Sequence, residues 1–160
     1  EYYYQYIDRD STLYFVGNYQ DYLPYYNKLV SYKNTLQSSD KIIFTGKVSS
    51  EEVHYHYSTA DVFICMSEHE GFCVPLLESM SYGIPTFAYD SGAIRSTMQN
   101  AGVIITKKMH EEIAELVDVI LNDTQLTQEI IDQQYEHLSF FSREKALKNL
   151  EQIIQEVRSM

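Results

Sequence analysis

Short apolar runs alternate with amphipathic segments along most of this 160-residue chain. Strands that are buried on both faces appear as nearly continuous apolar runs, so these runs predict strands. The predicted strands cover residues 12–17, 41–46, 61–66, 85–89 and 102–106. The segments between them predict helices over residues 24–36, 49–58 and 75–82. A capping box from Ser49 to Glu52 marks the start of the second helix, and Gly83 is a natural stop for the third.

Three further amphipathic segments predict helices that close the chain. Apolar positions at helical spacing mark one face of each, and we expect all three faces to pack in the core. The last of these helices covers residues 142–157, and its apolar stripe consists of Leu147, Leu150, Ile153, Ile154 and Val157. Strands alternating with helices predict an α/β fold: a Rossmann-like, three-layer arrangement with a parallel sheet covered by helices on both faces. Ligands of such sheets bind beyond the carboxyl ends of the strands.

Composition narrows the class of protein. The length fits a single domain, residues 1–160, and no apolar run approaches the ~20 residues that span a bilayer. Cys65 and Cys73 do not make a disulfide framework, and this favours a reducing, cytoplasmic setting. A net charge of −11 argues against nucleic acid and anionic membranes as partners. It does not exclude a nucleotide, because a small anion responds to local amides and charges.

The segment Ser67–Met80 carries the most chemical information. Two carboxylates, Glu70 and Glu78, flank a loop that leads into a helix opened by Pro75. Free amides at a helix N-terminus favour an anion, whereas carboxylates only accept hydrogen bonds and therefore suit hydroxyl groups. The amides concerned belong to Gly71, Phe72, Cys73 and Val74. The pattern fits a sugar nucleotide, although the spacing alone is equally compatible with solvent-facing or helix-capping acids.

The same segment resembles a known enzyme family. Glu70-Gly-Phe-Cys-Val-Pro-Leu-Leu-Glu78 is similar to the Glu-x7-Glu signature of family 4 retaining glycosyltransferases, which have the two-domain GT-B fold. Further ordered matches are Phe44-Thr-Gly46, Glu78-Ser-Met-Ser-Tyr-Gly-Ile-Pro85 and Asp90-Ser-Gly-Ala-Ile94. The similarity extends from about Leu13 to the end of the chain.

The resemblance implies that this half of the enzyme binds a nucleotide-diphosphate sugar. It assigns Glu70 as the catalytic residue, which contacts hydroxyls of the transferred sugar, and Glu78 as the residue that binds the ribose. The amides of residues 71–74 would hold the sugar and the diphosphate. The nucleobase would lie beside Gly46, Lys47 and Val48. The resemblance implies no metal and no other cofactor.

Two features depart from the family pattern. Cys73 stands where many members have glycine, so a positive φ there becomes costly. Cys73 is disfavoured as a nucleophile, because no base is evident and apolar surroundings raise the pKa of a thiol. The second departure is that residues 13–17 resemble the family's second strand. The first strand with its arginine and lysine, which is central in a 3-2-1-4-5-6 order, is not present.

We therefore expect a fragment of a longer protein, with residues 1–10 as the tail of an incomplete first helix. Its main partner would be an N-terminal acceptor-binding domain, and the fragment alone would transfer sugar poorly. Ten of the fifteen tyrosines precede residue 33. We expect them to pack on the missing region rather than to stack on nucleic acid.

The expected function is that of the donor-binding half of a hexosyltransferase. It would transfer a sugar with retention to a glycan or lipid-linked acceptor, in cell-surface polysaccharide or lipopolysaccharide synthesis. The enzyme would be cytoplasmic, with membrane contact through the missing half. One alternative is a non-catalytic nucleotide-sugar-binding module that partners a separate catalytic chain. Another is a sugar phosphorylase or epimerase of related fold.

Overall fold

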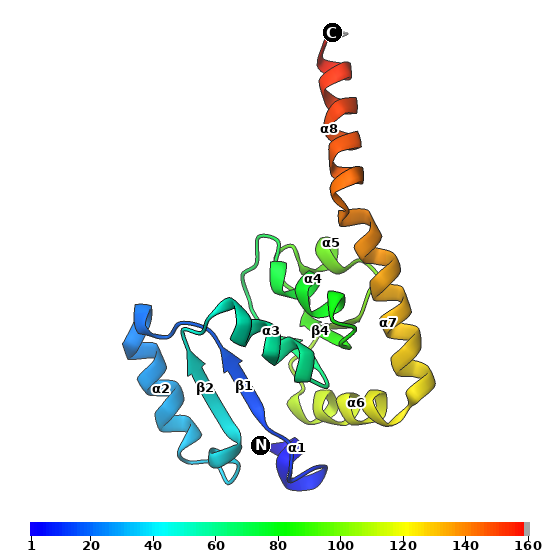
Figure 1. Cartoon of the computed structure of the whole chain (residues 1–160). Helices are drawn as coiled ribbons and strands as arrows, with labels where there is room; N and C mark the ends of the chain where they lie inside the picture. Colours follow the sequence, from blue (N-terminus) through cyan, green and yellow to red (C-terminus); the bar gives the residue numbers. More distant parts are fainter. Residues whose placement is uncertain (159–160) are drawn as a thin grey trace. The chain divides into compact units, whose positions relative to one another are not determined.

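The computed structural model describes residues 1–158, and strands alternate with helices in them as the hydrophobic pattern predicts (Figure 1). The strands are β1 (Leu13–Val16), β2 (Ile42–Gly46), β3 (Phe63–Cys65), β4 (Thr86–Tyr89) and β5 (Val103–Ile105). The helices are α1 (Tyr2–Tyr6), α2 (Leu23–Lys33), α3 (Ser50–Thr59), α4 (Val74–Ser81), α5 (Ile94–Met98), α6 (His110–Asn122), α7 (Thr124–Leu138) and α8 (Arg143–Arg158). All five predicted strands are confirmed to within two residues at each end. The short helix α5 was not predicted.

All strand pairs are parallel, which confirms the predicted Rossmann-like α/β class. The described strands form two sheets: β1 pairs with β2, and β4 lies between β3 and β5. The chain divides accordingly into two compact units. The first contains Glu1–Ala60 and Lys108–Asn122, and the second contains Asp61–Lys107 and the chain from Asp123 onward.

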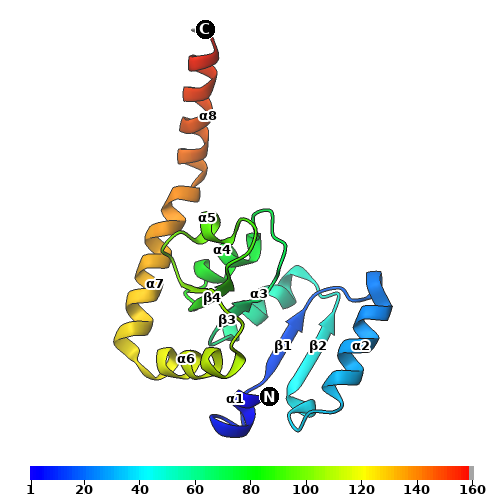
Figure 2. The same ribbon diagram turned by 180° about the vertical axis from the view of Figure 1, so that it is seen from behind.

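In the first unit, β1 is an apolar strand with one open edge. It pairs with β2 from Leu13 opposite Ile42 to Val16 opposite Gly46, and no other described strand pairs with it. All four of its residues, which are apolar or aromatic, are at least 40% exposed. Both views show α2 beside this sheet (Figures 1 and 2). The expectation of an adjacent strand outside these 160 residues remains a prediction.

The second unit contains the main hydrophobic core. Helix α4 contacts β3, β4 and α7. The largest completely buried apolar side chains come from α4, β4 and α5, and they are Leu76, Met80, Phe87, Ile94 and Met98. Cys73, the N-cap of α4, packs in this core, so the core holds the start of the helix.

Helix α8 matches the predicted bounds, but the prediction that its apolar stripe lies in the core is wrong. Leu147, Leu150, Ile153, Ile154 and Val157 are 43–66% exposed. An amphipathic pattern predicts a helix with one apolar face, but that face is buried only where another surface packs against it. No helix within residues 1–158 is both long enough and apolar enough to cross a membrane.

A buried glutamine on α7 connects that helix to the start of β4. Gln134 is 0% exposed. Its Nε2 donates to the carbonyl of Ile84 over 2.8 Å, and its Oε1 accepts from the amide of Thr86 over 3.0 Å. Both backbone groups are therefore satisfied by one side chain, as buried polar groups require.

The substitution Gln134→Leu is expected to lower the free energy of unfolding by about 1–3 kcal/mol, because it leaves the buried amide of Thr86 without a partner, while the carbonyl of Ile84 keeps only the hydroxyl of Thr86 as a donor. The midpoint of urea denaturation measures the change. Gln128→Leu is the matched control on an exposed position of α7 and should change stability by less than about 0.5 kcal/mol. Equal midpoints for the two variants would contradict the role of Gln134.

Candidate functional site

The loop that joins β3 to α4, with the first residue of that helix, carries five of the nine predicted site residues. β3 ends at Cys65, Cys73 is the N-cap of α4, and Pro75 lies in the first turn of the helix. The predicted helix start at Pro75 is therefore correct to within one residue. Glu70 lies in the middle of the loop and is half-buried.

The carbonyl groups of this loop are held by the segment that follows β4. The hydroxyl of Ser91 donates to the carbonyl of Ser67 over 2.6 Å. The amide of Ala93 donates to the carbonyl of Glu70 over 3.0 Å, and the hydroxyl of Thr97 donates to the carbonyl of Phe72 over 2.7 Å. We refer to these three hydrogen bonds as the carbonyl anchor. They hold the peptide units of Ser67, Glu70 and Phe72, and all three donors come from residues 91–97.

The amide groups of the loop remain available for a ligand. Within residues 1–158, the backbone amides of Gly71, Phe72, Cys73 and Val74 make no hydrogen bond. The carbonyl acceptors of the loop are thus used in hydrogen bonds within the fold, whereas its amide donors lie unbonded at the N-terminus of α4, the positive end of the helix dipole. This is the arrangement that an anion requires, and these are the amides that the sequence singled out.

Glycine at position 92 permits the carbonyl anchor to form. Gly92 has φ +53°, and a Cβ atom there would lie 2.4 Å from the carbonyl oxygen of Glu70. No side chain fits in that space, and the left-handed backbone is itself unfavourable for other residues. The sequence matched Asp90–Ile94 to the family pattern, but the contact of this segment with Glu70 was not predicted.

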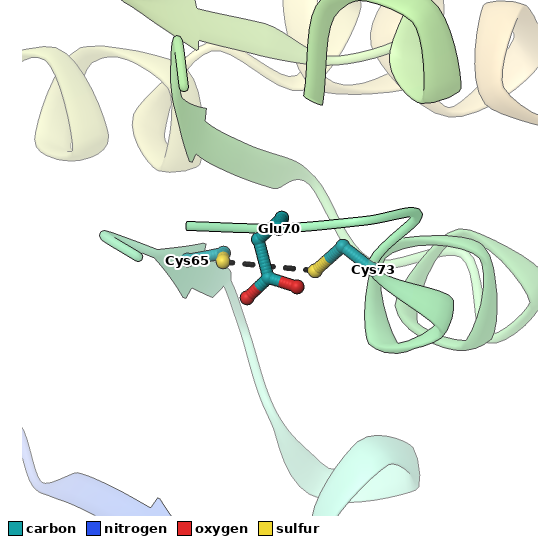
Figure 3. Close-up of side chains that lie close together, drawn as sticks. All are labelled: Cys65, Glu70 and Cys73. Carbon is teal, nitrogen blue, oxygen red and sulfur yellow. Dashed lines mark hydrogen bonds between the residues drawn. The ribbon is translucent and has the colours of Figure 1, made fainter. Parts of the chain in front are cut away.

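The two acids differ in their surroundings. Glu78 is exposed in α4, four residues after Val74, which begins the helix. Glu70 is half-buried, and its carboxylate lies beside two thiols (Figure 3). The roles given to the two acids in sugar and ribose binding remain predictions.

A pair of cysteines faces Glu70, and this juxtaposition was not predicted. The Sγ atoms of Cys65 and Cys73 lie 3.8 Å apart. Burial, together with the nearby Cys65 and Glu70, raises the pKa of the Cys73 thiol to about 12. This supports the expectation that Cys73 is a poor nucleophile. The eight-residue spacing of the cysteines was the only signal, and it predicts proximity only if the loop folds back on β3.

Cys73 has a positive φ, the unfavourable backbone conformation that was considered for it because many family members have glycine at this position. Its φ is 64° and its ψ is 67°, which is the left-handed region. A residue with a Cβ atom is disfavoured there by about 1–2 kcal/mol. The thiol is nevertheless buried, and it packs in the core cluster with Leu76 and Met80.

The predicted nucleobase loop belongs to the first unit. Gly46 ends β2, Lys47 is exposed and Val48 is half-buried. Ser49 and Glu52 form the predicted capping box at the start of α3. Gly46 lies against the ring of Tyr19, which stacks on Tyr26 with ring centroids 3.9 Å apart. The role of this loop in base binding remains a prediction.

The first unit also contains an aromatic cavity of about 280 Å³ at the carboxyl end of β1. Tyr19, Tyr22, Tyr25 and Tyr26 line it, together with Phe15 and Phe44 from the sheet. Several of the tyrosines that precede residue 33 therefore surround a concave surface. The expectation that they pack on a missing region is not tested by this arrangement.

Sequence comparison identifies a family for this fold and site. The sequence profile of the family "Glycosyl transferases group 1" matches residues 7–137. A relative in Mycobacterium tuberculosis, a GDP-mannose-dependent alpha-(1-6)-phosphatidylinositol monomannoside mannosyltransferase, is 28% identical over 109 residues. That match covers 62% of this chain but 28% of the relative. An alpha-monoglucosyldiacylglycerol synthase of Streptococcus pneumoniae is 36% identical over 66 residues, which are 41% of this chain and 15% of that one.

Solved structures share the fold. A glycosyltransferase from Rickettsia africae has a TM-score of 0.76 at 22% identity, and the match covers 92% of this chain and 40% of that one. Anabaena HepE, solved in complex with UDP-glucose, has a TM-score of 0.75 at 21% identity over 93% of this chain and 41% of that one. The chain thus spans about two-fifths of these structures and a smaller share of the curated relatives.

The substitution Gly92→Ala is expected to lower the free energy of unfolding by at least about 1–2 kcal/mol, because it strains the backbone and displaces the carbonyl of Glu70. The midpoint of chemical denaturation measures this. Gly71→Ala is the matched control in the same loop, since a Cβ atom there meets nothing within 4 Å. If both variants unfolded at the same midpoint, the carbonyl anchor would not depend on Gly92.

Proposed function

The chain belongs to the group 1 glycosyltransferase family, and we propose that it forms the donor-binding half of a retaining enzyme that uses a nucleotide-diphosphate sugar. One observation carries the proposal. The loop between β3 and α4 has its carbonyls of Ser67, Glu70 and Phe72 engaged, whereas the amides of residues 71–74 have no partner among the described residues. Such a loop is ready to receive an anion without rearrangement.

The proposed roles follow from the chemistry of each group. The amides of residues 71–74 bind the diphosphate and the adjacent sugar at the N-terminus of α4. Glu70 contacts hydroxyls of the transferred sugar, and Glu78 accepts hydrogen bonds from the ribose hydroxyls. In the first unit, Gly46, Lys47 and Val48 contact the base. The relatives include a GDP-mannose-dependent enzyme, and HepE is solved with UDP-glucose, so a nucleotide sugar is the ligand class to test.

The positive charge that the leaving diphosphate needs is proposed to come from outside these 160 residues. The chain carries 23 acidic and 12 basic residues, and the loop from Ser67 to Val74 contains neither lysine nor arginine. We propose that a further strand bearing arginine and lysine supplies it, together with an acceptor-binding domain. The edge of β1 that no other described strand pairs with is compatible with such a strand. The acceptor is proposed to be a growing polysaccharide or lipid-linked glycan.

Glu78→Gln is expected to weaken binding of the preferred nucleotide sugar by about 10–100-fold, because a hydrogen bond to a charged group contributes about 1.5–3 kcal/mol. Isothermal calorimetry on the protein at its natural length, with UDP-, GDP- and ADP-sugars, measures the affinity. Glu70→Gln should lower turnover by about 10²–10³ while retaining the fold. The control is Glu129→Gln at an exposed position of α7, which should match the unmodified protein. An unchanged affinity in Glu78→Gln would refute the assignment of the ribose.

Turnover of the protein at its natural length is expected to persist in excess chelator, since amides and basic side chains are proposed to balance the diphosphate. A radiolabelled-sugar transfer assay with and without chelator measures this. Complete loss of activity, restored by added Mg²⁺ or Mn²⁺, would contradict the proposal.

A further inference from the structure

Three potential metal ligands converge in the second unit. Cys65 at the end of β3, Glu70 in the loop and Cys73 at the N-cap of α4 each offer one donor atom, and these atoms lie within 4.8 Å of one another. Figure 3 shows the carboxylate of Glu70 beside both sulfur atoms. We call these three residues the thiol–carboxylate cluster. Cys73 is buried and the other two are half-buried.

The spacing of the sulfur atoms fits a tetrahedral ion. Zinc binds thiolate sulfur at about 2.3 Å, so two thiolates on one tetrahedral zinc lie roughly 3.8 Å apart. The Sγ atoms of Cys65 and Cys73 are separated by 3.8 Å. The carboxylate of Glu70 supplies a third donor, and a fourth position is left for water or another oxygen. All three donor atoms lie within 4.8 Å of one another.

The backbone of Cys73 gives a second, independent reason to look for a function of its thiol. Its φ of 64° is a conformation that glycine adopts freely and a residue with a Cβ atom does not. Packing of the thiol with Leu76 and Met80 accounts for its burial but leaves the backbone strain in place. Strain that persists at one residue beside a binding loop is typical of a functional side chain.

We propose that the thiol–carboxylate cluster binds one thiophilic divalent cation, such as Zn²⁺ or Cd²⁺. Each thiol releases its proton to solvent as its metal–sulfur bond forms, and the two thiolates with the carboxylate then surround the ion. Two soft sulfur ligands select against Mg²⁺ and Mn²⁺, which prefer oxygen. The site is separate from any metal requirement of sugar transfer.

The cation and the nucleotide sugar should exclude one another, and this consequence rests on the proposed function. The ion would occupy the Glu70 carboxylate that is proposed to contact the transferred sugar. It would also fix the loop from Ser67 to Val74 at both ends. The cluster would therefore make the enzyme sensitive to inhibition by thiophilic metals.

The test is a titration of Cd²⁺ and of Zn²⁺ into the reduced protein at its natural length, without nucleotide sugar. The charge-transfer absorption of cadmium thiolate reports sulfur ligation, and elemental analysis after gel filtration reports stoichiometry. One ion per chain is expected. Loss of a residue that only orients a metal ligand weakens metal affinity by about 10–100-fold. Loss of a ligand itself should therefore weaken Cd²⁺ binding by at least about 100-fold, and we expect this for Cys65→Ser, Cys73→Gly and Glu70→Gln.

The variants separate a metal site from a general effect on folding. Cys73→Gly removes the thiol while allowing the backbone its positive φ, so this variant is expected to fold, as circular dichroism can check. Glu68→Gln is the matched control, an exposed acid in the same loop, and should bind Cd²⁺ like the unmodified protein.

Two results would overturn the proposal. One is Cd²⁺ binding that Cys65→Ser and Cys73→Gly leave unchanged. The other is that the reduced protein binds no Cd²⁺ and that glutathione disulfide joins Cys65 and Cys73 in a disulfide. This result would assign the two cysteines to redox chemistry. Failure of nucleotide-sugar binding would leave the cadmium titration unaffected, so the two proposals can fail separately.

Discussion

The candidate site depends on a contact between two backbones. Gly92 lies so close to the carbonyl of Glu70 that a Cβ atom would stand 2.4 Å from its oxygen. Together with the hydrogen bonds from Ser91, Ala93 and Thr97, this approach determines the path of the loop before α4. The carbonyls of Ser67, Glu70 and Phe72 are thus engaged, whereas the amides of residues 71–74 make no hydrogen bond within residues 1–158. The site therefore depends on how the loop is held as well as on the helix that follows it.

Much of the fold could be predicted from the sequence because its elements are encoded locally. Strands such as residues 86–89 are short apolar runs, and Ser49 with Glu52 forms a capping box that both sequence and structure show. Pro75 placed the start of α4 to within one residue. The loop amides and the two acids also followed from spacing and family resemblance. In each case the relevant physics involves residues only a few positions apart.

Features that depend on distant segments were not predictable in the same way. The approach of Gly92 to Glu70 joins residues 22 positions apart, and the sulfur contact of Cys65 and Cys73 requires the loop to fold back on β3. Helix α5 was missed because a helix of five residues has too little periodicity to recognise. The stripe on α8 was correctly identified as helical and wrongly expected to be buried, since a helical period does not specify a partner.

The strand β1 has a consequence for handling these 160 residues. It presents four exposed apolar or aromatic residues and an edge without a described partner. An open apolar edge can pair with the same edge of another molecule, which leads to aggregation. Natural sheets protect such edges with lysine or proline, and a single charged replacement along β1 offers the same protection during recombinant production.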